Sequence, residues 1–190
     1  MDHLAIMKKS FKLLDKIVSG EKTIESRWYT SKRAPWDKIK PGEWVYFKNS
    51  GEPVTVRAKV AEVRQFSDLT PQKVRELSKR YLNAIGVEDE YLDVFVSYYI
   101  DKKYCILIFL ESVEKIESFE IDKTGFGAMA AWISVLNIDQ IKKYNTIGLR
   151  SGFRNRSGMV GRSPQSDETS EAPAGEPRMS EKTRRAGSSL

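Results

Sequence analysis

The segment that decides the fold is residues 40–60, which read KPGEWVYFKNSGEPVTVRAKV. Its proline and glycine occupy the positions that a type II turn favours, and a run of aromatic and aliphatic side chains follows, as in a β-strand. The polar loop at residues 49–52 closes a hairpin, and apolar residues at every second position over 54–60 predict the returning strand. The alternation slips by one position at Val63, which predicts a β-bulge near residues 61–62.

Apolar spacing and capping residues predict the remaining elements of the first 150 residues. Strands are predicted at residues 4–7 and 23–29 and, fully buried at its start, from Tyr104 to about Ile121. Helices are predicted at residues 9–18, from Pro71 to about Gly86 with Thr70 as the N-cap, from about Glu88 to Tyr99 and from about Ile138 to Tyr144. Strands of unequal length with helices inserted between them indicate an α+β domain. We expect a small curved sheet or barrel, plugged or flanked by these helices.

The composition changes near residue 150. Beyond Ser151 the sequence has no Ile, Tyr or Trp and is dominated by Ser, Gly, Pro, Arg and Glu. Such a segment cannot bury enough apolar surface to offset the entropy of ordering it. We therefore predict one domain over residues 1–150, followed by a disordered basic tail over residues 151–190.

The chain carries a moderate positive charge. Its net charge is +6, of which residues 1–150 contribute +4, from 25 Lys and Arg against 21 Asp and Glu. A positive excess suits a partner rich in phosphate, such as RNA, although many proteins with no nucleic-acid role carry a similar one.

The residue types exclude several kinds of chemistry. With one cysteine, Cys105, and one histidine, His3, the chain can form no internal disulfide and lacks the ligands for a zinc site. It also lacks an Asp-rich loop for a harder cation, so we predict no metal and no cofactor. Cys105 lies in an apolar run and is expected to be buried. His3 lies beside a chain end that is expected to fray, so we do not expect a catalytic Ser–His or Cys–His pair.

Nothing in the sequence predicts association with a membrane. The longest apolar run, Tyr104–Leu110, is too short to span a bilayer. The apolar residues 4–7 are followed at once by two lysines, so they do not form the core of a signal peptide. We expect a cytoplasmic protein; the sequence does not determine its oligomeric state.

Charged residues gather where a predicted helix gives way to a predicted strand, in the segment SGEKTIESR at residues 19–27. Gly20 ends the helix, and Lys22, Glu25 and Arg27 follow. Charges at a turn-to-strand junction are expected at the rim of a barrel, where they could orient one another around a ligand. The alternative is an exposed ion pair that contributes roughly 0–1 kcal/mol to stability.

A second candidate region follows the same strand. Lys32 and Arg33 lie in a basic loop just before Trp36, whose ring could stack on a nucleic-acid base for roughly 1–3 kcal/mol. Trp44 and Trp132 are instead assigned to the core.

The pattern Gly20-x-Lys22-x-x-Glu25-x-Arg27 resembles the signature of the ASCH family, whose domains contain a PUA-like β-barrel. The likeness covers most of residues 1–145 and none of the tail. It continues through residues 34–36, 39–43, 125–127 and 130–132.

The resemblance implies a cleft that receives RNA or a nucleotide. The residues expected to bind it are Lys22, Arg27, Lys32, Arg33 and Trp36. The fold class implied is a small PUA-like β-barrel with inserted and flanking helices, acting as an RNA-binding module.

The resemblance also implies an alternative, a metal-independent hydrolase acting on RNA or on a modified nucleoside. Some family members are ribonucleases, and small bacterial relatives hydrolyse the acetyl amide of acetylcytidine with a Lys, a Thr and a Glu. Lys22 matches that lysine and would be the general base or nucleophile, while Glu25 stands at the threonine position and would carry the proton. The candidates for the third residue are Glu76, Glu88 and Glu90.

Overall fold

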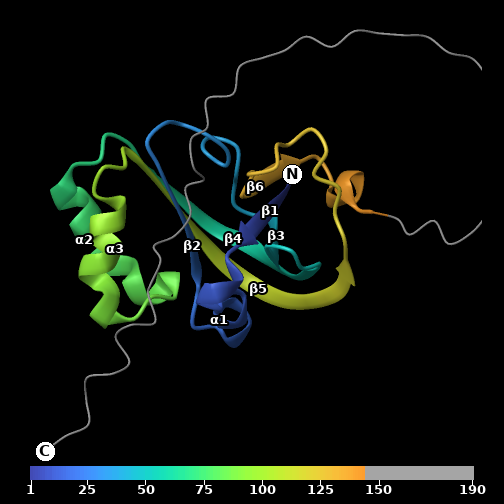
Figure 1. Ribbon diagram of the computed structural model, residues 1–190, viewed down its shortest axis with the longest axis horizontal. Coiled ribbons are helices and arrows are strands. Elements are labelled where there is room, and N and C mark those ends of the chain that lie inside the picture. Colours follow the sequence, from blue (N-terminus) through green and yellow to red (C-terminus); the bar gives the residue numbers. More distant parts are fainter. Residues whose placement is uncertain (144–190) are drawn as a thin grey trace, which may run out of the picture.

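The computed structural model of the protein describes residues 1–143 (Figure 1). The predicted tail at residues 151–190, and the predicted boundary at residue 150, lie outside the described residues. Within residues 1–143, no helix is long and apolar enough to cross a membrane.

A six-stranded sheet that curls into an open half-barrel forms the body of the domain (Figure 1). Its strand order is β2-β5-β4-β3-β1-β6, and all neighbours are antiparallel except β1 and β3. The strands are β1 (Asp2–Met7), β2 (Ile24–Tyr29), β3 (Trp44–Asn49), β4 (Val54–Phe66), β5 (Tyr104–Phe119) and β6 (Trp132–Val135). Within residues 1–143, β2 and β6 are the two edges of the sheet, and no backbone ladder joins them. The prediction of an α+β domain built on a curved sheet is confirmed.

Two long strands give the sheet its curl. The register of β4 against β5 shifts at three places, one of them between Val60 and Glu62. Each register shift increases the local twist of the strand and bends it. The bulge predicted near residues 61–62 is therefore confirmed.

Three α-helices and three 3-10 turns complete the described chain. They are α1 (Leu13–Ser19), α2 (Pro71–Ile85) and α3 (Leu92–Tyr99), with η1 (Lys9–Phe11), η2 (Asp89–Tyr91) and η3 (Ile138–Ile141). The predicted cap of α2 is confirmed, because the Thr70 side chain accepts a hydrogen bond from the backbone of Lys73 at 3.2 Å. In Figure 1, α2 and α3 lie together on one side of the sheet.

Three elements of the structure differ from the sequence-based predictions. The helix predicted at residues 9–18 is split, because Lys12 adopts a left-handed conformation with φ 51°. The last predicted helix is only the 3-10 turn η3 within the described residues. Strand β6 was not predicted.

Each face of the sheet has its own apolar core. The interior of the half-barrel is filled by alternate residues of the strands, including Ala5, Phe47 and Ile108. The helices α2 and α3 cover the opposite face of β2 and β5. A third core joins the outer face of β1 and β6 to η3, which is also fixed by a hydrogen bond from the backbone of Ile138 to the Asp2 carboxylate at 2.8 Å.

Candidate functional site

Polar side chains line the interior of the half-barrel at its two edge strands. On β2, Tyr29 belongs to the interior core, whereas Ile24 and Trp28 pack under the helices. Because side chains alternate along a strand, Glu25 and Arg27 share the inward face of Tyr29. On β6, Trp132 belongs to the same interior core and Ser134 shares its face. We call these facing residues of β2 and β6 the seam.

A buried ion network occupies the β2 side of the seam. The ammonium of Lys22 donates hydrogen bonds to the backbone oxygens of Ile24 and Ile85, both at 2.8 Å, and lies 3.2 Å from Oε2 of Glu25. The other carboxylate oxygen of Glu25 lies 2.8 Å from Nη2 of Arg27. The side chains of Lys22 and Glu25 are 1% and 2% exposed.

The prediction that these charges lie at an exposed rim is therefore wrong for Lys22 and Glu25. The C-terminal end of α2 rests on this segment, where the backbone of Thr23 donates a hydrogen bond to Ala84 at 2.9 Å. The carbonyl end of a helix attracts a cation. At the end of α2 this cation is the ammonium of Lys22, which donates to the backbone oxygen of Ile85.

Opposing effects act on the Glu25 carboxyl group. Its burial alone would raise the pKa, but the charges of Lys22 and Arg27 and their hydrogen bonds outweigh burial, and the pKa is lowered. Glu25 is therefore ionised at neutral pH, and it holds the Arg27 guanidinium in place.

Arg27 spans the seam. Its side chain is 12% exposed, and its guanidinium carbon lies 5.2 Å from the centre of the Trp132 ring on β6. A cation over an indole face is attracted to it. Side chains thus connect the two edge strands where backbone hydrogen bonds do not.

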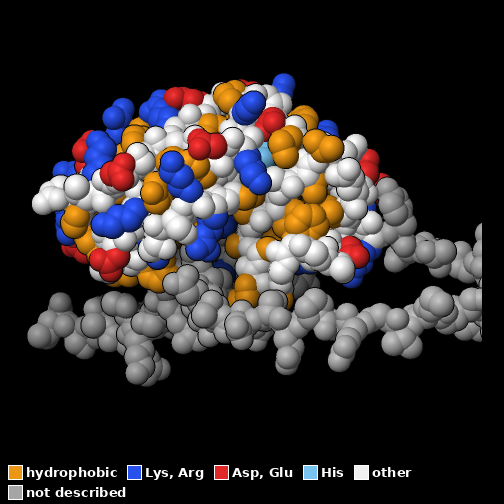
Figure 2. Space-filling view, turned by 90° about the horizontal axis from the view of Figure 1, so that it is seen from above, with side chains coloured by type: hydrophobic (Ala, Val, Ile, Leu, Met, Phe, Trp, Pro, Cys, Tyr) orange, Lys and Arg blue, Asp and Glu red, His pale blue; other side chains and the backbone are white. Residues whose placement is uncertain are grey.

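The predicted basic loop adjoins the β2 end of the seam. The hydroxyl of Tyr29 donates to the backbone of Ala34 at 3.1 Å, and the Arg33 guanidinium lies 5.5 Å from the Tyr29 ring centre. Lys32 lies 5.5 Å from the ring centre of Trp36, and that ring meets Tyr104 edge to face at 5.1 Å. Trp36 is half-buried. Figure 2 shows Lys and Arg side chains along the middle of one face of the molecule.

Tyr29 lies beside the basic loop, on the same face of β2 as Arg27. Burial raises the pKa of its hydroxyl, and the charges of Arg27 and Arg33 partly oppose this. The structure therefore places Arg33 beside the Tyr29 ring and Lys32 beside the Trp36 ring.

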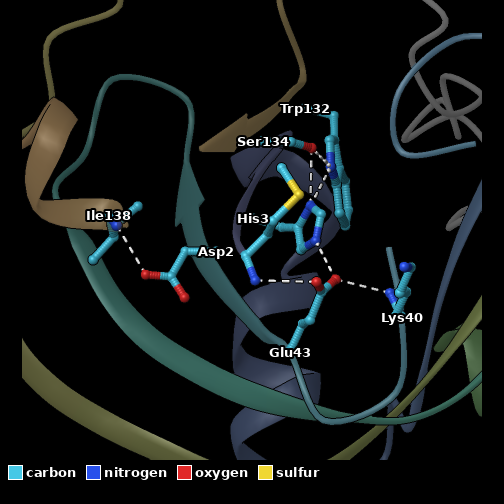
Figure 3. Close-up of polar contacts among 8 residues, drawn as sticks. Asp2, His3, Lys40, Glu43, Trp132, Ser134 and Ile138 are labelled. Atoms are coloured by element: carbon cyan, nitrogen blue, oxygen red, sulfur yellow. Dashed lines mark hydrogen bonds and ion pairs between the residues drawn. The ribbon is translucent and has the colours of Figure 1, made fainter. Parts of the chain in front are cut away.

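A second polar cluster lies on the other side of the seam (Figure 3). His3 of β1 lies opposite Ser134 of β6, with Nδ1 2.9 Å from the serine oxygen. Its Nε2 lies 2.9 Å from Oε2 of Glu43, which ends the turn before β3. The indole nitrogen of Trp132 donates to Ser134 at 3.2 Å and lies 3.4 Å from Nδ1 of His3.

The expectation that His3 lies in a frayed end is wrong, because its side chain is fully buried. Desolvation lowers the pKa of the imidazole, and the hydrogen bond and charge of Glu43 only partly oppose this. Burial would raise the pKa of Glu43, but hydrogen bonds from His3, the Lys40 backbone and the N-terminal ammonium outweigh it and lower the pKa. At neutral pH the carboxylate is ionised and the imidazole neutral.

Sequence reasoning missed this cluster because its members are far apart in the chain. The signal that would reveal it is the pairing of β1 with β6, which brings residues 131 positions apart face to face. That pairing depends on a four-residue strand, WISV, which shows no clear alternation of polar and apolar residues.

Other candidate residues lie outside the seam. Glu76 pairs with Lys73, Glu88 lies 3.6 Å from Lys16, and Glu90 is exposed on η2. Within the part of the chain that the structure describes, the ion pairs of Glu76 and Glu88 are with these lysines and not with the buried network.

The described residues offer little for metal or thiol chemistry. Residues 1–143 contain no group of three or more His, Cys, Asp and Glu side chains placed to hold a metal ion. Cys105 is buried as predicted, and burial raises the pKa of its thiol well above the usual value, so it is an unreactive core residue.

Comparisons with known proteins identify the fold. No protein-family model and no curated protein matches the sequence. Two solved structures of the ASCH protein from Zymomonas mobilis do match, one with a tyrosine-to-phenylalanine and one with a serine-to-alanine substitution. Each covers 73% of this chain at 16% identity with a TM-score of 0.53, and the match spans 93% and 91% of those chains respectively. The chain has the ASCH fold. The resemblance predicted from residues 20–27 is confirmed at this level, and the seam is a feature of an ASCH-type half-barrel.

Proposed function

We propose that this ASCH-type domain binds RNA or a nucleotide at the seam and the adjoining basic loop. The observation that carries the proposal is the position of Arg27, which a buried carboxylate holds against an indole ring at the opening of the half-barrel. Arg33 and Lys32 add two exposed cations nearby, each beside an aromatic ring.

The chemistry of this region matches the two parts of a nucleotide. Guanidinium groups donate several hydrogen bonds in a plane and suit phosphate oxygens. Aromatic rings such as Trp36 suit bases, because every base has a flat face. Among the described residues, the carboxylate on the β2 side of the seam is Glu25, and two cations, Arg27 and Lys22, pair with it. The net field at the opening therefore favours an anion.

Lys22 takes a different role from the one expected of it. Its ammonium is buried and directed to two backbone oxygens and Glu25, so it does not reach a bound phosphate in this arrangement. We assign to Lys22 and Glu25 the positioning of Arg27, and to Arg27, Lys32, Arg33 and Trp36 the contact with RNA.

Binding of labelled single-stranded RNA tests the proposal. Arg27→Ala and the double variant Lys32→Ala/Arg33→Ala are each expected to weaken binding about tenfold and to reduce the salt dependence by about one phosphate contact per cation removed. Arg75→Ala is the matched control, because Arg75 is an exposed arginine on α2 paired with Asp93. Absence of binding by the parent protein, or an equal loss in the control, would contradict the proposal.

A metal-independent hydrolase that uses Lys22 and Glu25 is a second candidate. The observation in its favour is the buried pair of an amine and a carboxylate 3.2 Å apart. In such an enzyme Lys22→Arg would be inactive, because arginine does not lose its proton. Turnover of acetylcytidine, unaffected by a strong chelator, would support this candidate, and no turnover of acetylcytidine or labelled RNA would leave binding as the function.

A further inference from the structure

The partners of the His3 ring fix where its protons lie. An ionised Glu43 can only accept, so Nε2 of His3 carries a hydrogen and donates it. A neutral imidazole then has a bare Nδ1, which accepts from the hydroxyl of Ser134 at 2.9 Å. The indole of Trp132 only donates, and its N–H is shared between the serine oxygen at 3.2 Å and Nδ1 of His3 at 3.4 Å. The serine proton is thereby directed at a base.

The geometry points to a serine nucleophile centre composed of Ser134, His3 and Glu43. Its substrates are carboxylic esters or amides that carry an anionic group, which Arg27 would hold beside Trp132. A nucleophile, a base that contacts it and a carboxylate that orients the base are the three parts such catalysis requires. Here the two ring nitrogens are exchanged relative to the more common arrangement, since Nδ1 faces the serine and Nε2 the carboxylate.

The reaction would proceed in two balanced steps. The oxygen of Ser134 attacks the acyl carbon while its proton passes to Nδ1 of His3. The bond from carbon to the leaving alcohol or amine then breaks, and the leaving group takes that proton. Water repeats the sequence on the acyl-serine and releases the carboxylic acid, so no oxidant, reductant or metal enters. Glu43 keeps the ring in its tautomer and stabilises the imidazolium that forms.

The free edge of β6 supplies a donor for the oxyanion. The backbone of Ile6 donates to the oxygen of Ala131, so Ala131 directs its backbone groups toward β1. Antiparallel pairing alternates, so the N–H groups of Trp132 and Ser134 point to the outer edge of β6, which no other strand of residues 1–143 pairs with. The N–H of the nucleophile itself can therefore face a tetrahedral intermediate, as an oxyanion donor must.

The exposure of the three side chains fits this assignment. The His3 side chain is fully buried, the Glu43 side chain is 15% exposed, and Ser134 is partly buried on an edge strand. A fully buried base beside a partly exposed serine is the order of exposure that a nucleophile centre needs.

A fluorophosphonate probe tests the centre on the full-length protein, without a known substrate. It reacts with activated serines by forming an oxygen–phosphorus bond and releasing fluoride. The parent is expected to carry one adduct, which peptide mass spectrometry locates on Ser134. Ser134→Ala should abolish it, and His3→Gln should slow it by at least about 100-fold, the usual contribution of a general base. Ser118→Ala, which changes an exposed serine of β5, should react like the parent.

The outcome for the parent protein alone decides the proposal, even if a variant fails to fold. An unlabelled parent, or an adduct on any residue other than Ser134, overturns it. Equal labelling of a folded His3→Gln variant overturns the assignment of the base. The assay contains no RNA, so its failure leaves RNA binding untouched, and loss of RNA binding by Arg27→Ala leaves the serine centre untouched.

Discussion

The two polar clusters on either side of the seam differ in what their hydrogen bonds do. The ammonium of Lys22 is directed to the backbone oxygens of Ile24 and Ile85 and to a carboxylate, so it fastens a helix to a strand. The hydroxyl of Ser134 is directed at the bare nitrogen of His3. In the first cluster the charge of Lys22 is neutralised by structural contacts, whereas in the second cluster the proton of Ser134 lies against a base. Burial of polar groups alone therefore does not identify the reactive side.

The largest expected effect is on stability, from Lys22→Ala. Removing the ammonium leaves Glu25 buried with only one of its two cations, and breaking a buried ion pair in this way typically destabilises a protein by about 3–5 kcal/mol. Lys16→Ala is the matched control, because Lys16 donates to the next carbonyl of the same helix end, Gly86, from a half-exposed position. We expect the control to lose no more than about 1 kcal/mol. Urea unfolding measures both, and equal losses would contradict the distinction.

The next effect concerns acid stability and Glu25→Gln. The pKa of Glu25 is lowered by folding, so its contribution is present above the unfolded pKa of about 4.3 and is lost as the pH falls through the lower folded value. We expect the variant to be less stable at pH 7 by about 1–3 kcal/mol, the usual cost of leaving buried hydrogen-bonding groups without their partner, and to show a flatter decline below about pH 4. Thermal unfolding from pH 7 to pH 2 measures the difference. If the stability of the variant falls between pH 4 and pH 2 as steeply as that of the parent, Glu25 is not paired as described.

A smaller effect comes from a glycine against which Lys22 packs. Gly86 has φ +91°, and an added Cβ would lie 3.1 Å from Cβ of Lys22. Gly20 has a similar φ of +81° with nothing within 4 Å, so Gly20→Ala measures the conformational cost alone, about 1–2 kcal/mol. Gly86→Ala should cost more, and the excess reports contact with Lys22. If the two variants are equally stable, the side chain of Lys22 moves aside without any loss in the free energy of unfolding.

The smallest effect is expected from Trp132→Phe. Phenylalanine keeps a ring beside Arg27 but removes the N–H that Ser134 accepts, so the loss should be about 0.5–1.5 kcal/mol. RNA binding should change little, whereas fluorophosphonate labelling should slow. A large loss of RNA binding with unchanged labelling would reverse the roles assigned to the two clusters.

Local pattern predicted much of the fold. The alternation over residues 54–60, the slip at Val63 and the Thr70 cap all describe interactions between near neighbours, and each is found in the structure. The same is true of the contacts among Lys22, Glu25 and Arg27, which lie within six residues of one another.

The local pattern of residues could not predict which element, distant in the sequence, buries a given residue. Lys22 has the sequence context of an exposed turn, and only the end of α2, 63 positions away, buries it. His3 likewise becomes a buried base only through β6 and the turn at Glu43. A split at Lys12 was also beyond sequence reasoning, because lysine carries no preference for a left-handed conformation.

The pairing of β1 with β6 has a consequence for how the protein is made. His3 and Ser134 are 131 positions apart, so at typical synthesis rates the ribosome needs on the order of ten seconds between them. The edge of the half-barrel beside β1 stays uncovered during that interval, and long-range closure of this kind is slow in folding generally. A nascent chain can assemble the Lys22 network once α2 has emerged from the ribosome. Ser134 becomes available only when β6 has been synthesised. The hydroxyl and its base therefore meet only in a chain whose sheet is already complete.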